Sequence, residues 1–117
     1  MADPFVLNRK TILDRLGGDE EIFAVMLDMY LQDVDSNCAT LAAALASGDA
    51  AALKREVHTV KGLLATFSDE DGAAEALAVE QKVRHGEAAG LELAVAALQA
   101  RLREVGVVLG NELARLR

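Results

Sequence analysis

The stretch AAALKREVHTVKGLLATF, Ala50 to Phe67, decides the fold class, because its apolar residues recur every three or four positions without a break. The residues of this series are Ala50, Leu53, Val57, Val60, Leu64 and Phe67. Such spacing places apolar side chains on one face of an α-helix, whereas a half-buried strand would alternate with a period of two. Asp49, directly before the stretch, is a good N-cap residue. The stretch therefore predicts an amphipathic helix with one buried face.

The same periodicity occurs in the longer segments 19–47 and 91–116. Their apolar series are Phe23, Leu27, Tyr30, Val34, Cys38, Leu41 and Leu45, and Leu91, Val95, Leu98, Leu102, Val105, Leu109, Leu113 and Leu116. A short helix is predicted from Asn8 to Leu16, and a further helix from Ser68, its expected N-cap, to near Gly86. We expect an all-α fold, an antiparallel up-down four-helix bundle with a short additional N-terminal helix. No repeat or linker interrupts residues 1–117, which predicts a single domain.

The composition limits the partners that the chain can have. Apolar residues make up 52% of the chain, enough for a buried core, and the formal net charge is −7. Such an acidic balance argues against nucleic acid as a partner, since phosphate backbones require a basic surface. No apolar run of about 18 residues occurs, so no membrane partner is expected. The lone Cys38 is interpreted as a reduced thiol, and we expect a soluble cytoplasmic monomer.

His58 lies in the middle of the predicted helix 50–67, and at about 100° per residue it points roughly 130° away from the apolar series. It is therefore predicted to face outward. Two kinds of residue share that outer face. The cations are Lys54, Arg55 and Lys61, and the small residues are Ala51, Gly62 and Ala65.

This arrangement suits phosphoryl chemistry. An exposed neutral imidazole is a competent nucleophile near neutral pH, and nearby cations stabilise the negative charge of a phosphoryl group. Gly62, one turn after His58, removes bulk from the space that a phosphoryl group or partner needs. The alternative is that His58 is simply a surface histidine on a solvated face.

His58, Lys61 and Gly62 also form an H-x-x-K-G sequence, which resembles the motif of histidine-containing phosphotransfer (HPt) domains, the shuttles of multistep phosphorelays. The resemblance extends to LGGDEEIFAVMLDMYLQD (16–33), ALASGDAAALKREVHTVKG (44–62) and EQKVRHGE (80–87). It covers roughly residues 7–109 and implies the same helical bundle. Leu63, on a flank of the helix, either covers a helix seam or contacts a partner.

The resemblance implies that His58 accepts a phosphoryl group on Nε2 from a receiver-domain phospho-aspartate and passes it to another receiver aspartate. Lys61 would neutralise the phosphate, and Gly62 would give access. Response-regulator receiver domains and a hybrid sensor kinase are the implied partners. No nucleotide-binding motif occurs, so no ATP-dependent autokinase activity is expected. No cofactor or metal is expected on this chain, and the magnesium needed for transfer would lie on the receiver.

Glu80 is an acid among the apolar positions predicted to face inward on the fourth helix: Ala73, Ala76, Leu77 and Val83. A buried acid needs a partner. The resemblance implies that Glu80 hydrogen-bonds Nδ1 of the active histidine and leaves Nε2 free. The alternative is a boundary glutamate that pairs with Arg84 four residues later.

Two hypotheses about function follow. The first is a phosphorelay intermediate with His58 as the phosphate carrier. The second is a helical-bundle docking module that binds a receiver or kinase partner without phosphotransfer. The chain length fits a free-standing shuttle and equally a domain excised from a larger hybrid kinase.

Overall fold

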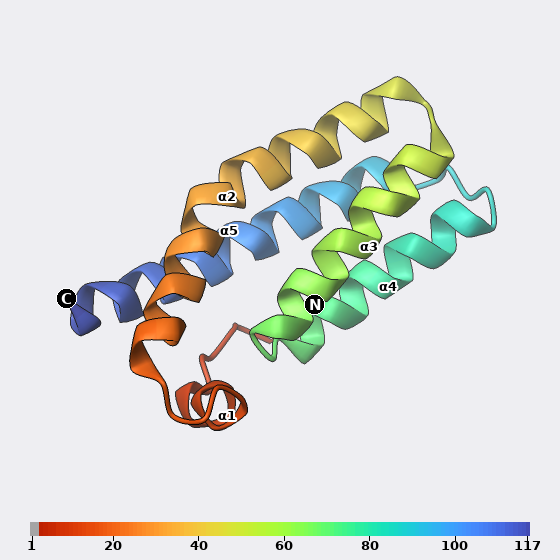
Figure 1. Cartoon of the computed structure of the whole chain (residues 1–117). Helices are drawn as coiled ribbons and strands as arrows, with labels where there is room; N and C mark the ends of the chain where they lie inside the picture. The colour runs from red at the N-terminus through yellow and green to blue at the C-terminus, as the bar shows by residue number, and fades with distance from the viewer. Residues whose placement is uncertain (1–2) are drawn as a thin grey trace.

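Five α-helices make up most of residues 3–117, the part of the chain that the computed structural model describes (Figure 1). They are α1 (Arg9–Arg15), α2 (Glu20–Ser47), α3 (Ala50–Thr66), α4 (Glu70–Arg84) and α5 (Leu91–Leu116). No strand occurs within residues 3–117. The predicted all-α fold is confirmed.

The four long helices form a bundle in which α2 packs against α3 and α5, and α4 also packs against α3 and α5 (Figure 1). Consecutive long helices are antiparallel, as their short connections require. With 28 and 26 residues, α2 and α5 are much longer than α3 and α4, which have 17 and 15. The bundle is therefore elongated, at 43 × 22 × 21 Å, and α1 packs against α2.

Most predicted helix starts agree with the structure. The side chains of Asn8, Asp19 and Asp49 accept hydrogen bonds from backbone N–H groups in the first turns of α1, α2 and α3. The predicted cap at Ser68 is wrong, because Asp69 caps α4 by accepting from the Gly72 N–H. Ser68 instead adopts a left-handed backbone conformation, with φ at +60°.

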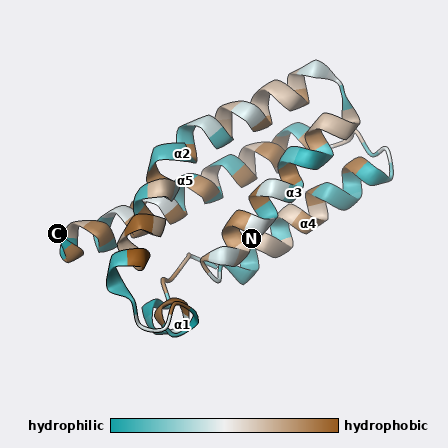
Figure 2. Ribbon diagram, viewed as in Figure 1, coloured by the Kyte–Doolittle hydropathy of each residue, from teal (hydrophilic) through white to brown (hydrophobic). Residues whose placement is uncertain are grey.

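The apolar series of α2 and α5 face the core as predicted, and so does that of α3 except for its first residue, Ala50, which is exposed. Their most deeply buried side chains include Phe23, Leu27, Leu41, Val57, Leu64, Leu98, Leu102 and Leu109. In α4 the prediction for Leu77 is wrong: Leu77 is 40% exposed, while Val79 is buried. Hydrophilic and hydrophobic residues are interspersed along each long helix, as expected for helices with one buried side (Figure 2).

A buried ion pair joins the start of α4 to α5. Arg101 donates to both carboxylate oxygens of Asp69, with N–O distances of 2.8 and 2.6 Å, and both side chains are at most 4% exposed. Arg101 also donates to the Asp3 carbonyl oxygen at 2.6 Å, and Glu104 accepts from the Phe5 N–H at 2.7 Å. The pair therefore holds the N-terminal segment against the bundle as well.

Candidate functional site

His58 lies in the middle of α3 with its ring in solvent, the side chain being 69% exposed. The core residues Val57 and Val60 fix the rotation of the helix, and this turns His58 outward as predicted. The predicted neighbours Ala51, Lys54, Arg55, Gly62 and Ala65 are also exposed. A Cβ atom on Gly62 would have no neighbour within 4 Å, so the surface beside His58 is open.

Glu80 of α4 contacts the inner edge of the His58 ring. The distance between His58 Nδ1 and Glu80 Oε2 is 2.9 Å, while the Glu80 side chain is only 6% exposed. This hydrogen bond joins an exposed group to a buried one and fixes the ring from one side. Nε2, the other ring nitrogen, is left on the side away from Glu80.

Two cations share the Glu80 carboxylate with His58. Lys61 Nζ lies 3.3 Å from Oε1 and 3.5 Å from Oε2, and the Lys61 side chain is 26% exposed. Arg84, one turn after Glu80, has a guanidinium nitrogen 4.0 Å from Oε1 and is 56% exposed. The pairing of Glu80 with Arg84, the alternative weighed from the sequence, therefore coexists with the hydrogen bond to His58.

These contacts set the ionisation of Glu80. Burial raises the pKa of the carboxyl, but the hydrogen bonds and charges of His58 and Lys61 outweigh burial, so the pKa lies below its ordinary value. Glu80 is thus ionised at neutral pH and can only accept hydrogen bonds. Nδ1 of His58 must then be the donor, which leaves Nε2 of the neutral ring with its lone pair.

Leu63 is half-buried and packs against the core. The second histidine, His85, is the C-terminal cap residue of α4.

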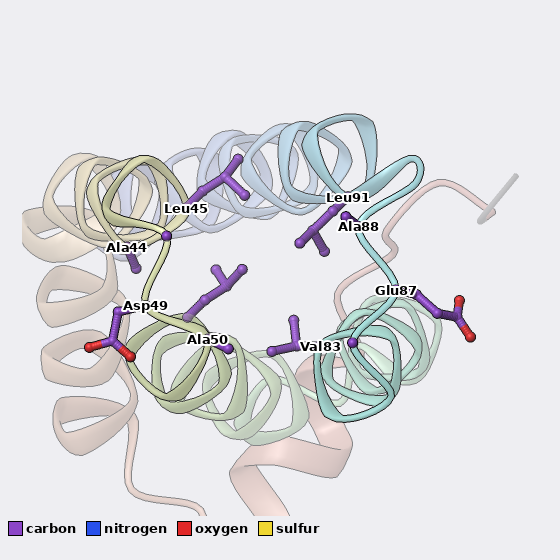
Figure 3. A pocket seen from close by; sticks show the side chains of 11 residues that line it. Ala44, Leu45, Asp49, Ala50, Val83, Glu87, Ala88 and Leu91 are labelled. Carbon is purple, nitrogen blue, oxygen red and sulfur yellow. The ribbon is translucent and has the colours of Figure 1, made fainter.

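Other features of the described residues lie away from His58. Between residues 3 and 117, no three His, Cys, Asp or Glu side chains converge as metal ligands would. An apolar pocket of about 180 Å³ lies where α2 passes into α3 and α4 into α5, with Leu45, Val83 and Leu91 in its walls (Figure 3). His58 is not among its lining residues. No helix within the described part is long and apolar enough to cross a membrane.

The Hpt domain family model matches residues 25–117. The chain belongs to the Hpt domain family. Its function is histidine phosphotransfer in a phosphorelay, and HPt proteins interact with receiver domains. The docking module without phosphotransfer, the second hypothesis from the sequence, is therefore disfavoured.

One solved structure has the same fold. The crystal structure of histidine-containing phosphotransfer protein B (HptB) from Pseudomonas aeruginosa PAO1 matches with a TM-score of 0.84 and 24% identity, covering 95% of this chain and 96% of that one. At this identity the likeness supports the fold. The comparison with curated proteins returned no match.

Proposed function

We propose that His58 is the residue of this HPt domain that carries the phosphoryl group, on Nε2, between receiver aspartates. The observation that carries this proposal is the pairing of a 69% exposed ring with a buried carboxylate, at 2.9 Å from Nδ1. The nitrogen that the carboxylate does not hold is the one available to a partner. His85, the other histidine of the sequence, has no hydrogen bond from its ring to the rest of residues 3–117.

Nε2 attacks the phosphorus of an aspartyl phosphate on the receiver. The N–P bond forms as the P–O bond breaks, and the electron pair of the broken bond leaves with the aspartate carboxylate. The ring keeps its Nδ1 proton and becomes positively charged, and Glu80 stabilises this charge across the 2.9 Å hydrogen bond. In the return step a second receiver carboxylate attacks the phosphorus, and the N–P electron pair returns to Nε2. No base is needed, because no proton leaves Nε2.

The remaining predicted site residues have supporting roles in this proposal. Lys61 neutralises charge on the transferring phosphoryl group, and Gly62 leaves space for it. The exposed residues Ala51, Lys54, Arg55 and Ala65 contact the receiver, whose acidic pocket would face this basic surface of an acidic chain.

The proposal also includes a hybrid sensor kinase as phosphate source, a monomeric state and a cytoplasmic location. The one cysteine, Cys38, is a buried free thiol, and a cytoplasmic location requires no disulfide of this chain. We further propose that residues 1–117 act as one domain, since the N-terminal segment is hydrogen-bonded to α5.

The test uses receiver domains phosphorylated with a small phosphodonor, mixed in turn with the wild type and two histidine variants. The wild type and His85→Gln should acquire acid-labile, alkali-stable phosphate, and His58→Gln should not. Label on His58→Gln equal to the wild type, or no label on the wild type with any receiver, would contradict the proposal. Glu80→Ala should slow transfer while circular dichroism shows an intact bundle, and an unchanged rate would remove the role of Glu80.

A further inference from the structure

Glu80 is a buried carboxylate with three cationic or proton-donating groups around it. His58 lies at 2.9 Å and Lys61 at 3.3 Å, both from α3, and Arg84 lies at 4.0 Å on its own helix. Among residues 3–117, no other cation comes within 4.0 Å of this carboxylate. Arg84 has no ion pair with any other acid of the described chain, so no competing partner draws it away from Glu80.

We propose that Arg84 is a positioning residue for phosphotransfer, which replaces Lys61 as the ion-pair partner of Glu80 while Lys61 contacts the phosphoryl group on His58. This inference rests on the proposed role of His58. In the free protein Lys61 pairs with Glu80. In the phosphorylated protein Lys61 contacts the phosphate, and Arg84 pairs with Glu80. Arg84 is the residue that makes the exchange possible.

The contacts of Lys61 permit it to leave. Its Nζ is divided between both Glu80 oxygens, at 3.3 and 3.5 Å, and these distances exceed the usual range for a charge-assisted hydrogen bond. Lys61 lies three positions after His58 and thus on the same face of α3. A lysine ammonium is a point charge on a flexible stem, and a phosphoryl group with two negative charges attracts it more strongly than one carboxylate does.

Glu80 requires a replacement when Lys61 leaves. At 6% exposure the carboxylate has little access to water, and its remaining partner, the Nδ1–H of His58, is a single donor. A buried charge that loses its partner is strongly unfavourable. Without a second cation, Glu80 would tend to take the Nδ1 proton, and the ring would lose the positive charge that the transfer step creates.

Arg84 has the geometry to fill this role. It lies four residues after Glu80, one helical turn on, where side chains of opposite charge meet. A movement of about 1 Å would bring its guanidinium from 4.0 Å to hydrogen-bonding distance of Oε1. The guanidinium stays charged at every relevant pH, and with 56% exposure it can move without repacking the core.

The test compares Arg84→Gln with the wild type in both states of the protein, using phosphoramidate to phosphorylate the histidine directly. In the free protein the ¹⁵N and ¹H resonances of the His58 ring should be unchanged, because Lys61 still pairs with Glu80. In the phosphorylated protein the Nδ1–H resonance should shift and exchange faster with water. Transfer between His58 and a receiver should slow about fivefold, the equivalent in rate of one solvent-exposed ion pair. Arg84→Lys should restore most of the rate.

Lys82→Gln is the matched control, since it removes the same charge from the same helix at a side chain that pairs with Glu87 instead. It should transfer at the wild-type rate. Ring resonances of phosphorylated Arg84→Gln identical to the wild type would overturn the exchange, because Lys61 would then serve both anions. If Lys82→Gln slows transfer as much as Arg84→Gln does, the slowing comes from the loss of net charge, and the positioning role of Arg84 is overturned. Failure of the wild type to form phosphohistidine at position 58 would instead overturn the proposed function, and the exchange with it.

Discussion

Glu80 determines how the site responds to acid. Burial raises the pKa of its carboxyl from the ordinary value of 4.5, but the hydrogen bonds from His58 and Lys61 outweigh burial, and the net direction is downward. A group with a lower pKa in the folded state stabilises the fold above its ordinary pKa. That contribution is lost as the pH falls through the folded-state pKa.

We therefore predict that the wild type exceeds Glu80→Gln in free energy of unfolding by a constant amount near neutral pH. The excess should shrink as the pH falls below the ordinary carboxyl pKa of 4.5 and through the lower folded-state pKa of Glu80. Urea denaturation of both proteins over this range measures it. An excess that grows on acidification would mean that the pKa of Glu80 is raised, not lowered, and that His58 and Lys61 do not hold it ionised.

Gly62 permits a prediction in which stability and activity change in opposite directions. It lies inside α3, where alanine is more stable than glycine by about 1 kcal/mol, and a Cβ atom there would touch nothing within 4 Å. Gly62→Ala should therefore raise the free energy of unfolding by about 1 kcal/mol. It should also slow phosphotransfer, because the added methyl group lies on the approach to His58. Chemical denaturation and receiver assays check the two effects.

Thr40→Ala is the control for Gly62→Ala. Thr40 is exposed on α2, and alanine again favours the helix, but the change does not alter the surface around His58. It should stabilise the protein slightly and leave transfer unchanged. If Gly62→Ala transfers as fast as the wild type, glycine is not needed for access.

Among single residues, the sequence revealed Glu80 because a charge interrupts an apolar series. The same signal was present at Arg101 and Glu112, which share the spacing of Leu98, Leu102, Leu109 and Leu113 and are buried in the structure. Their partners could not be predicted, because Asp69 lies 32 residues from Arg101, and Arg9 lies 103 residues from Glu112. A periodic pattern predicts that a side chain is buried, but pairing depends on how the helices pack.

For the elements, helix existence and most starts followed from spacing and capping residues, whereas the start of α4 did not. Ser68 and Asp69 are both good caps by residue type. Asp69 caps α4 because Arg101 holds its carboxylate from α5, a contact that no local pattern contains. The error at Leu77 has a similar origin: α4 is short and alanine-rich, so several rotations about its axis would bury similar apolar surface.

The start of α4 gives a prediction that opposes helix propensity. A Cβ atom on Gly72 would collide with the Asp69 carboxylate and lie 3.0 Å from Leu64 Cδ1. Gly72→Ala should therefore lower the free energy of unfolding by about 1–2 kcal/mol, although alanine favours helices, since overpacking costs more than the gain in propensity. Gly62→Ala is the matched control, the same chemical change with the opposite expected sign. Stabilisation by both variants would show that Asp69 does not need this space.

In the whole molecule, the buried pair of Asp69 and Arg101 connects three parts of the chain that are distant in sequence. It joins the start of α4 to α5, and through the Asp3 carbonyl it reaches the N-terminal segment. The hydrogen bonds that Arg101 donates to Asp69 raise the pKa of Arg101 and keep the guanidinium charged despite burial. Removal of one partner would leave the other as an uncompensated buried charge.

Arg101→Gln should therefore lower the free energy of unfolding by about 3 kcal/mol. It should also release the N-terminal segment, since Arg101 donates to the Asp3 carbonyl, and Glu104, which accepts from the Phe5 N–H, lies beside the same guanidinium. Urea denaturation measures the first effect, and faster hydrogen exchange at Phe5 measures the second.

Arg103→Gln is the control for Arg101→Gln. Arg103 pairs with Asp35 on the surface, where the Arg103 side chain is 56% exposed, so its loss should leave the unfolding midpoint unchanged. Equal destabilisation by the two variants would show that burial does not set the strength of these ion pairs. An unchanged rate of hydrogen exchange at Phe5 in Arg101→Gln would show that Arg101 does not hold the N-terminal segment in place.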